Sequence, residues 1–174
     1  MKTTDNRIKK FKDIFYADNT FICGSSATIL NEAASQLRNL NAAGKRVLIT
    51  DPYLFPNNPH STYQSEIISL LKGLGSTQII YCAKSKRNDT FFQQVSTILQ
   101  ADGIALDFSD KLDECHDRFW YCPETEKCVV FGTSLNGIGR KISRIDMLSN
   151  DEVNELKSYF TNAGILTTGG NDES

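Results

Sequence analysis

The sequence lacks a long apolar segment and an excess of charge of either sign. Its apolar runs, such as Val47-Leu48-Ile49, are far shorter than the roughly 20 residues that cross a bilayer, so we expect no membrane span. The 19 Lys and Arg residues nearly balance the 21 Asp and Glu residues, which excludes a strongly basic chain and an acidic tail. The lysine-containing N-terminus has no apolar stretch behind it, which predicts a cytoplasmic protein without a secretory signal.

Cysteine is sparse and odd in number. The five cysteines lie in apolar or strand-like surroundings, which is typical of reduced thiols and not of a disulfide framework. Cys122 and Cys128 flank a turn, and we expect them to face each other across a hairpin. With Cys115 and His116 they suggest a metal cluster, but the absence of a paired Cys-x2-Cys knuckle makes this the weaker alternative.

The length and composition fit one globular unit. A chain of 174 residues that is 40% hydrophobic can bury one core, and it shows no internal repeat. We therefore predict a single domain over residues 1–164, followed by a flexible C-terminal tail over residues 165–174 that ends in a glycine-rich polar segment.

Hydrophobic periodicity predicts an α/β fold. Helices are expected from Ser25 or Ser26 to Leu40, and over Tyr63–Gly73, Asn88–Ala101 and Asp151–Phe160, the last capped by Asn150 or Asp151. Strands are expected over Arg46–Thr50, Gln78–Ala83 and Ile104–Phe108, with a strand-turn-strand segment over Asp13–Cys23. This alternation is typical of a mainly parallel sheet with helices on its faces.

Two further strands form an antiparallel hairpin that carries the most informative residues. The hairpin is expected over Phe119–Cys122 and Lys127–Phe131. His116 and Arg118 precede it two residues apart, so on a strand both side chains would point to the same face and address one ligand.

A loop rich in small polar residues follows the hairpin. The stretch from Gly132 to Gly139 includes Thr133, Ser134 and Asn136, and its backbone N–H groups are suited to an anion. Together with a guanidinium, which binds oxyanions with two N–H groups, this loop predicts a phosphate site. The structural alternatives are a hydrogen-bonded histidine without a catalytic role and polar residues that merely cap a turn.

An acidic residue lies further along the chain. Asp146 is a candidate to orient His116 by accepting the proton of its other ring nitrogen. The alternative is a surface ion pair of Asp146 with Arg144 or Lys141.

Cationic residues lie near two ends of the predicted strands. Arg140 and Lys141, together with Arg144, follow the candidate loop, and the segment Lys84-Ser85-Lys86-Arg87 follows a strand. These cations could form a rim that attracts a polyanion, and ordinary solvated loops are the alternative. Asp51-Pro52-Tyr53 also ends a strand, although a turn alone explains it.

At these residues the chain resembles the phospholipase D superfamily, whose signature runs His-x-Lys, then Asp, then Gly-Ser-x-Asn. The resemblance matches His116, Arg118, Ser134 and Asn136 to the signature histidine, lysine, serine and asparagine, and Asp146 to a nearby acidic position. It implies a phospholipase D-like α/β fold with the motif on the hairpin. It also implies a metal-independent phosphodiesterase without an organic cofactor, in which His116 forms a phosphohistidine.

Three departures from the signature leave a second interpretation open. Arg118 replaces the lysine, Pro123 and Glu124 stand where the aspartate is expected, and the interval from His116 to Asn136 is three residues longer. Arginine keeps the charge but changes the donor geometry, so binding should tolerate this replacement better than catalysis. His-Asp-Arg also resembles the phospholipase D-like domain at the C-terminus of MIT-domain proteins, which implies lipid or partner binding without hydrolysis.

The resemblance also carries expectations about partners. A chain with a single motif implies a homodimer, because the family mechanism needs two histidines. We expect a nuclease acting on nucleic acid in preference to membrane lipid, because the chain has no amphipathic membrane anchor. A place in a larger bacterial defence or DNA-processing complex is a further expectation drawn from the resemblance.

Overall fold

The computed structural model describes residues 20–22, 26–83, 87–112, 115, 117–135 and 143–166. Within these residues, one sheet has seven strands in the order β1-β7-β6-β5-β2-β3-β4. The strands are β1 (Thr20–Ile22), β2 (Arg46–Thr50), β3 (Gln78–Cys82), β4 (Ala105–Ser109), β5 (Arg118–Cys122), β6 (Lys127–Phe131) and β7 (Ser143–Met147).

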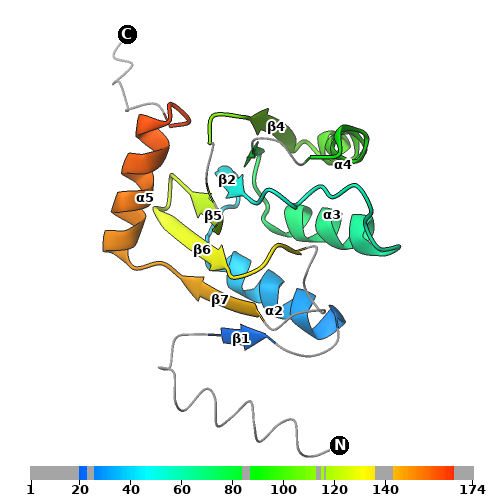
Figure 1. The fold of residues 1–174 in the computed structure, drawn as a ribbon, viewed down its shortest axis with the longest axis horizontal. Coiled ribbons are helices and arrows are strands. Elements are labelled where there is room, and N and C mark those ends of the chain that lie inside the picture. Colours follow the sequence, from blue (N-terminus) through cyan, green and yellow to red (C-terminus); the bar gives the residue numbers. More distant parts are fainter. Residues whose placement is uncertain are drawn as a thin grey trace, which may run out of the picture.

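The sheet is mixed. Strands β2, β3 and β4 are parallel, whereas β5 is antiparallel to β2 and begins an antiparallel run through β6, β7 and β1. The carboxyl end of β2 and the amino end of β5 therefore meet at one edge, and the motif hairpin packs directly beside the parallel strands (Figure 1).

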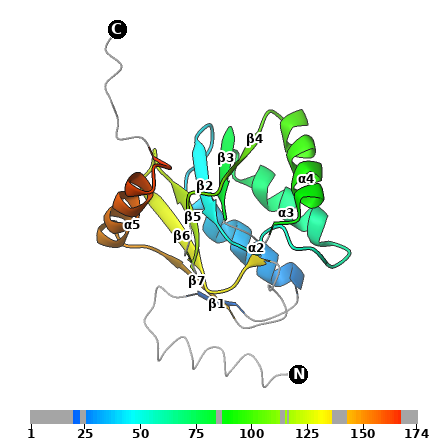
Figure 2. The ribbon, with the colours of Figure 1, turned by 45° about the horizontal axis from the view of Figure 1, so that its top comes forward.

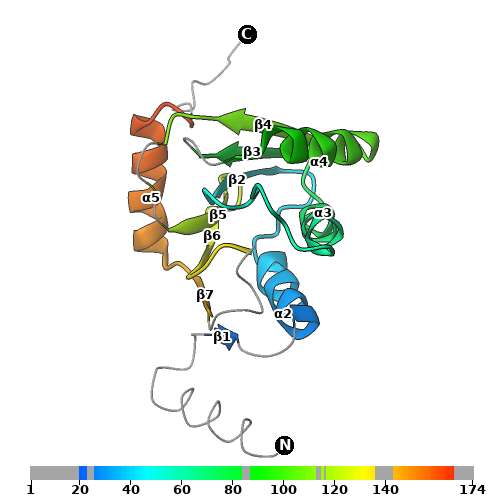
Figure 3. The same ribbon diagram turned by 45° about the vertical axis from the view of Figure 1, so that its right-hand side comes forward.

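Four described helices cover the two faces unequally. Helices α2 (Ser26–Arg38), α3 (Tyr63–Gly73) and α4 (Asp89–Ala101) lie on one face, and α5 (Asn150–Asn162) lies on the other (Figures 2 and 3). We call these the three-helix face and the α5 face. No described helix has the length and apolar character needed to span a membrane.

The three-helix face carries the larger core. Its strands contribute residues at alternate positions, including Val47 and Ile49 of β2 and Trp120 of β5, all fully buried against the three helices. Phe55 adds edge-to-face ring contacts with Tyr81, Phe91 and Phe92.

The α5 face has a smaller core. Leu48, Tyr121 and Cys128 project from the sheet and pack against Val153, Leu156 and Phe160 of α5. The Tyr121 and Phe160 rings stack with their centroids 5.7 Å apart. Helix α5 begins with a capping box in which the side chains of Ser149 and Glu152 each bind the other residue's backbone N–H.

The structure confirms the α/β prediction, including the parallel strands, the four helices and the hairpin. Strand β7 was missed, because the charged residues Arg144 and Asp146 on its α5 face hide the alternation. The cap of α5 was also placed one or two residues late, since the cap is Ser149. Most of the predicted strand-turn-strand at Asp13–Cys23 lies outside the described residues, and β1 is its described part.

The interpretation that Cys122 and Cys128 face each other across the hairpin is wrong. Cys128 pairs in register with Tyr121, and Cys122 with Lys127, so the two thiols lie on opposite faces of the sheet. Four cysteines are described and all are free thiols; burial raises the pKa of Cys82 to about 12. The division into a domain at 1–164 and a tail at 165–174 stays a prediction.

Candidate functional site

Arg118 is the first residue of β5 and lies on the three-helix face. Its side chain alternates with that of Phe119 and shares a face with the buried Trp120. Nη1 of Arg118 donates a hydrogen bond to the carbonyl oxygen of Gly132 at 3.4 Å. Its Nε is buried and has no hydrogen-bond partner among the described residues. The guanidinium therefore spans from the start of β5 to the end of β6 and keeps an unused donor.

Thr50 fixes the start of β5 against the end of β2. Its hydroxyl donates to the carbonyl oxygen of Asp117 at 3.0 Å and accepts from the backbone N–H of Phe119 at 2.9 Å. The Cys115 thiol donates to the Thr50 hydroxyl oxygen at 3.5 Å. Arg118 lies between the two residues that Thr50 binds, so this hydroxyl sets the position from which the guanidinium starts.

The loop after β6 brings a hydroxyl to the same edge. Gly132 donates its backbone N–H to the carbonyl oxygen of Arg144 at 2.8 Å, and a Cβ at Gly132 would approach the Arg144 backbone to 3.4 Å. Two residues later the Ser134 side chain is buried, with Thr133 half-buried before it. Gly132 thus packs directly against β7, and the loop that carries Ser134 starts from this contact.

A buried carboxyl lies between Arg118 and Ser134. Asp51 follows β2 directly, and its side chain is fully buried on the three-helix face. Its Oδ1 accepts the backbone N–H of Tyr53 at 3.0 Å, and its own carbonyl oxygen accepts the Tyr81 hydroxyl at 2.9 Å. Asp51 is thus held at the carboxyl end of a central parallel strand, where open α/β sheets bind ligands.

Burial dominates the electrostatics of Asp51. It raises the pKa of Asp51 to about 6, against the opposing effects of Ser134, the Tyr53 N–H, the Arg118 charge and the Leu135 N–H. The Ser134 hydroxyl is near enough to lower this pKa but does not form a well-aligned hydrogen bond, because Asp51 Oδ2 and Ser134 Oγ both lack a partner among the described residues. Perturbed carboxyls of this kind are common at functional sites.

The structure does not bring Asp146 to this cluster. Asp146 pairs in register with Val130, and its neighbour Ile145 belongs to the core of the three-helix face, so Asp146 lies on the α5 face. It forms an ion pair with Arg144, which is the surface alternative weighed from the sequence. Burial raises the pKa of Asp146, and the Arg144 charge opposes this rise. Its role in orienting His116 stays a prediction.

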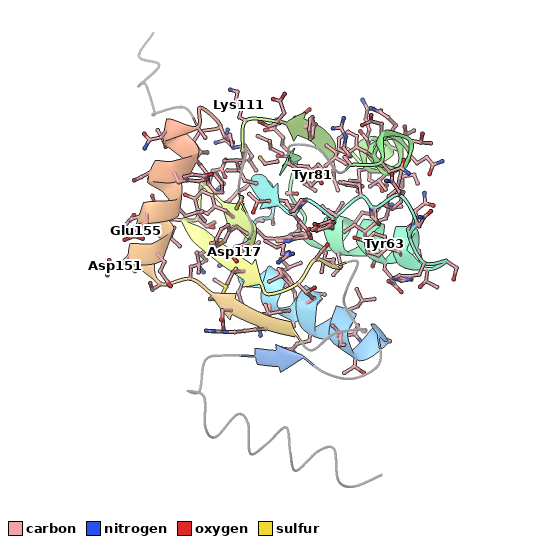
Figure 4. The ribbon with its side chains drawn as sticks, in the orientation of Figure 1. Tyr63, Tyr81, Lys111, Asp117, Asp151 and Glu155 are labelled. Atoms are coloured by element: carbon pink, nitrogen blue, oxygen red, sulfur yellow. The ribbon has the colours of Figure 1, made fainter. Side chains whose placement is uncertain are left out.

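A groove on the α5 face surrounds Asp146. It has a volume of about 880 Å³ and runs between the sheet and α5. Its lining includes four acidic residues. Figure 4 labels two of them, Asp117 beside β5 and Glu155 on α5. The four are Asp117, Asp146, Glu152 and Glu155. Their charge disfavours an anionic ligand in this groove.

Several predicted site residues lie outside the described residues, namely His116, Asn136, Arg140 and Lys141, together with Lys84–Lys86 of the proposed cationic rim. The described residue of that segment, Arg87, pairs with Asp89 at 2.6 Å and lies over the Phe108 ring at 3.6 Å from its centroid. Arg87 is thus engaged by an acid and an aromatic ring.

Sequence reasoning noted that Asp51 ends a strand at a functional edge but did not assign it to the site. The available signal was an acidic residue directly after a buried strand, in Asp51-Pro52-Tyr53, but the same residues explain a turn. Only the burial of the carboxyl beside Arg118 and Ser134 separates the two interpretations. Among the described residues, no group of three or more His, Cys, Asp or Glu side chains is arranged to hold a metal ion.

The fold is similar to that of phospholipase D superfamily proteins of known structure. Polyphosphate kinase from Porphyromonas gingivalis matches 98% of this chain at 10% identity with a TM-score of 0.51. Phosphatidylserine synthase from Haemophilus influenzae Rd KW20 matches 92% at 12% identity, also with a TM-score of 0.51. The chain spans 29% and 41% of these two proteins. No family profile matches the sequence, and no curated protein matches it. The chain thus has a phospholipase D-like fold.

Proposed function

From this fold as the starting point, we propose that the protein is a metal-independent phosphodiesterase that acts on nucleic acid as a homodimer. The observation that carries the proposal is that Arg118 and Ser134 meet at one edge of the sheet. Arg118 begins the first strand of the motif hairpin, and Ser134 follows its second strand. In this arrangement the guanidinium and the hydroxyl hold phosphoryl oxygens, which is the largest contribution a protein makes to phosphoryl chemistry. Thr133 and Asn136 complete the loop, and Arg140 and Lys141 attract the polyanion.

His116 is the proposed nucleophile. An imidazole nitrogen bonds to phosphorus while the bond from phosphorus to the leaving oxygen breaks, and the imidazolium of His116 from a second copy protonates that oxygen. Water then attacks the phosphohistidine, the second imidazole takes up its proton, and the nitrogen–phosphorus bond breaks. One motif per chain thus requires two chains per site.

The test is a cleavage assay with chelator present on single- and double-stranded DNA, RNA, bis(p-nitrophenyl) phosphate and a phospholipid. We expect His116→Ala and Arg118→Ala to lower the rate by at least about 100-fold, and the matched control Arg38→Ala, an exposed arginine on α2, to leave it unchanged. Arg118→Lys restores the signature residue and should retain activity. Rates unchanged by both alanine substitutions, or abolished by chelator alone, contradict the proposal.

A second candidate is a binding module without turnover. Two observations favour it: Asp146 pairs with Arg144 on the α5 face, and the Asp51 carboxyl lies close enough to Arg118 to offset its charge. This candidate predicts that a phosphate-containing ligand binds, that Arg118→Ala abolishes binding, and that no substrate is cleaved. Anionic vesicles and oligonucleotides, tested in parallel, separate a lipid ligand from a nucleic acid.

A further inference from the structure

Three buried polar atoms belong to Asp51, at the carboxyl end of β2, and to two residues near enough to affect its pKa. They are Asp51 Oδ2, Ser134 Oγ and Arg118 Nε, and none has a hydrogen-bond partner among the described residues. Buried polar atoms are nearly always paired, and each unpaired atom costs about 1–3 kcal/mol. A cluster of such atoms is therefore suited to a polar ligand that would supply the missing partners.

The carboxyl in this cluster has little freedom to move. Its Oδ1 is bound to the Tyr53 N–H, and the backbone of Asp51 is tied to β3 through the Tyr81 hydroxyl. The second oxygen, Oδ2, is therefore the one left without a hydrogen-bond partner among the described residues. As a carboxylate it can only accept hydrogen bonds, and as a carboxylic acid it can also donate one.

The charged and titratable groups that face Asp51 come from three elements. Arg118 of β5 lowers the pKa of Asp51. Tyr63 of α3 and Tyr81 of β3 both have a raised pKa, mainly through burial and secondarily through the Asp51 charge, so both are neutral at physiological pH. Arg118 is thus the described group whose positive charge an anionic ligand and Asp51 would share.

We propose that Asp51 competes with the bound phosphoryl group for Arg118, so that its protonation sets the affinity of the site. The proposal rests on the proposed phosphate site and deepens it. An ionised Asp51 offsets the guanidinium charge and repels the ligand. A protonated Asp51 leaves the guanidinium free and offers its O–H to a phosphoryl oxygen, next to the Ser134 hydroxyl. Asp51 is therefore a residue that sets the affinity of the site and makes binding tighter at low pH.

The size of the effect follows from the population of the protonated form. Because burial brings the pKa of Asp51 to about 6, roughly one molecule in 100 is protonated at pH 8, against most molecules at pH 5. When only one form binds well, the apparent affinity equals the affinity of that form multiplied by the fraction of molecules in it. We therefore expect phosphodiester binding to weaken by roughly 10- to 100-fold from pH 5 to pH 8.

The experiment measures binding of a short single-stranded DNA, whose phosphodiester charge is constant over this range, to the full chain by calorimetry. All proteins carry His116→Asn, which removes the titration of the histidine and prevents cleavage. We expect Asp51→Asn to bind at pH 8 as tightly as the Asp51 protein does at pH 5, and to show no dependence on pH. The matched control Asp107→Asn, an exposed acid on β4, should keep the original pH dependence.

The possible results separate this inference from the proposed function. Loss of binding in Arg118→Ala together with the same pH dependence in Asp51→Asn overturns the role of Asp51 and leaves the phosphate site standing. No DNA binding by any variant at any pH overturns both. Asp51→Ser, a second neutral substitution, serves if Asp51→Asn does not fold, and it too should abolish the pH dependence.

Discussion

The two faces of the sheet differ in both packing and charge. The three-helix face continues its hydrocarbon core up to the edge where Asp51, Ser134 and Arg118 meet, so Asp51, Ser134 and the Nε of Arg118 are buried, while Arg118 as a whole is half-buried. The α5 face has a smaller core and leaves an open groove lined by acidic side chains. Strand alternation sends Arg118 to the first face and Asp146 to the second, although a linear motif suggests that they act together.

This difference indicates where an anion can bind. A guanidinium in a buried setting interacts with phosphate far more strongly than an exposed one, because water screens it less. The acidic residues of the α5 groove produce the opposite potential. The three-helix edge is therefore the face on which we place the phosphate site, and the following predictions test this distinction.

The largest effect is expected in the core of the three-helix face. Trp120 is fully buried and contacts the Phe131 ring, so Trp120→Ala should lower the free energy of unfolding by about 3–5 kcal/mol. Denaturant unfolding measures this, with the exposed Tyr159→Ala on α5 as a control expected to change stability by less than about 0.5 kcal/mol. A much larger loss from Phe160→Ala than from Trp120→Ala would reverse the ranking of the two cores.

An intermediate effect is expected from the buried carboxyl. The folded chain holds the Asp51 proton more tightly than the unfolded chain, because its pKa is about 6 and not 3.8. This contribution to stability is complete below about pH 4 and is lost as the pH rises through about 6. The free energy of unfolding of Asp51→Asn, taken relative to that of wild type, should therefore rise by up to about 3 kcal/mol between pH 4 and pH 7. A difference in the free energy of unfolding between Asp51→Asn and wild type that is the same at pH 4 and pH 7 would show that Asp51 is not buried as described.

The smallest effect is expected on the α5 face. Asp146 pairs with a largely exposed Arg144, so Asp146→Asn should cost at most about 1 kcal/mol of stability. Because it lies on the face opposite to Arg118, we expect DNA affinity to change by less than about threefold. Titration of the variant with the same oligonucleotide tests this. A loss as large as that of Arg118→Ala would place both residues at one site.

Local patterns in the sequence were sufficient to predict most of the fold. The parallel strands and their helices follow from apolar periodicity, and the hairpin follows from two apolar runs around a Pro-containing turn. Strand β7 was missed because its pairing with β6 and β1 is a long-range property, while its own sequence carries charges at Arg144 and Asp146. The strand propensity of individual residues does not indicate which strands pair.

The candidate site was predicted only in part. The Gly132-Thr133-Ser134 step and Arg118 could be recognised by their residue types and by the resemblance to the phospholipase D signature, and the structure brings Arg118 and Ser134 to one edge. Asp51 lies more than 60 residues before Arg118 in the chain, so no local pattern connects them. The face on which Asp146 lies depends on the register of β7 against β6, which a shift of one residue would reverse.

The sequence by itself determined the secondary structure, the α/β class and the chemical groups available near the hairpin, because these depend on neighbouring residues. The tertiary structure alone decided which groups meet. It placed an acid from the end of β2 beside a cation from the start of β5, and it buried the acid deeply enough for desolvation to raise the acid's pKa. Proximity and burial are properties of packed elements, and no stretch of sequence carries them.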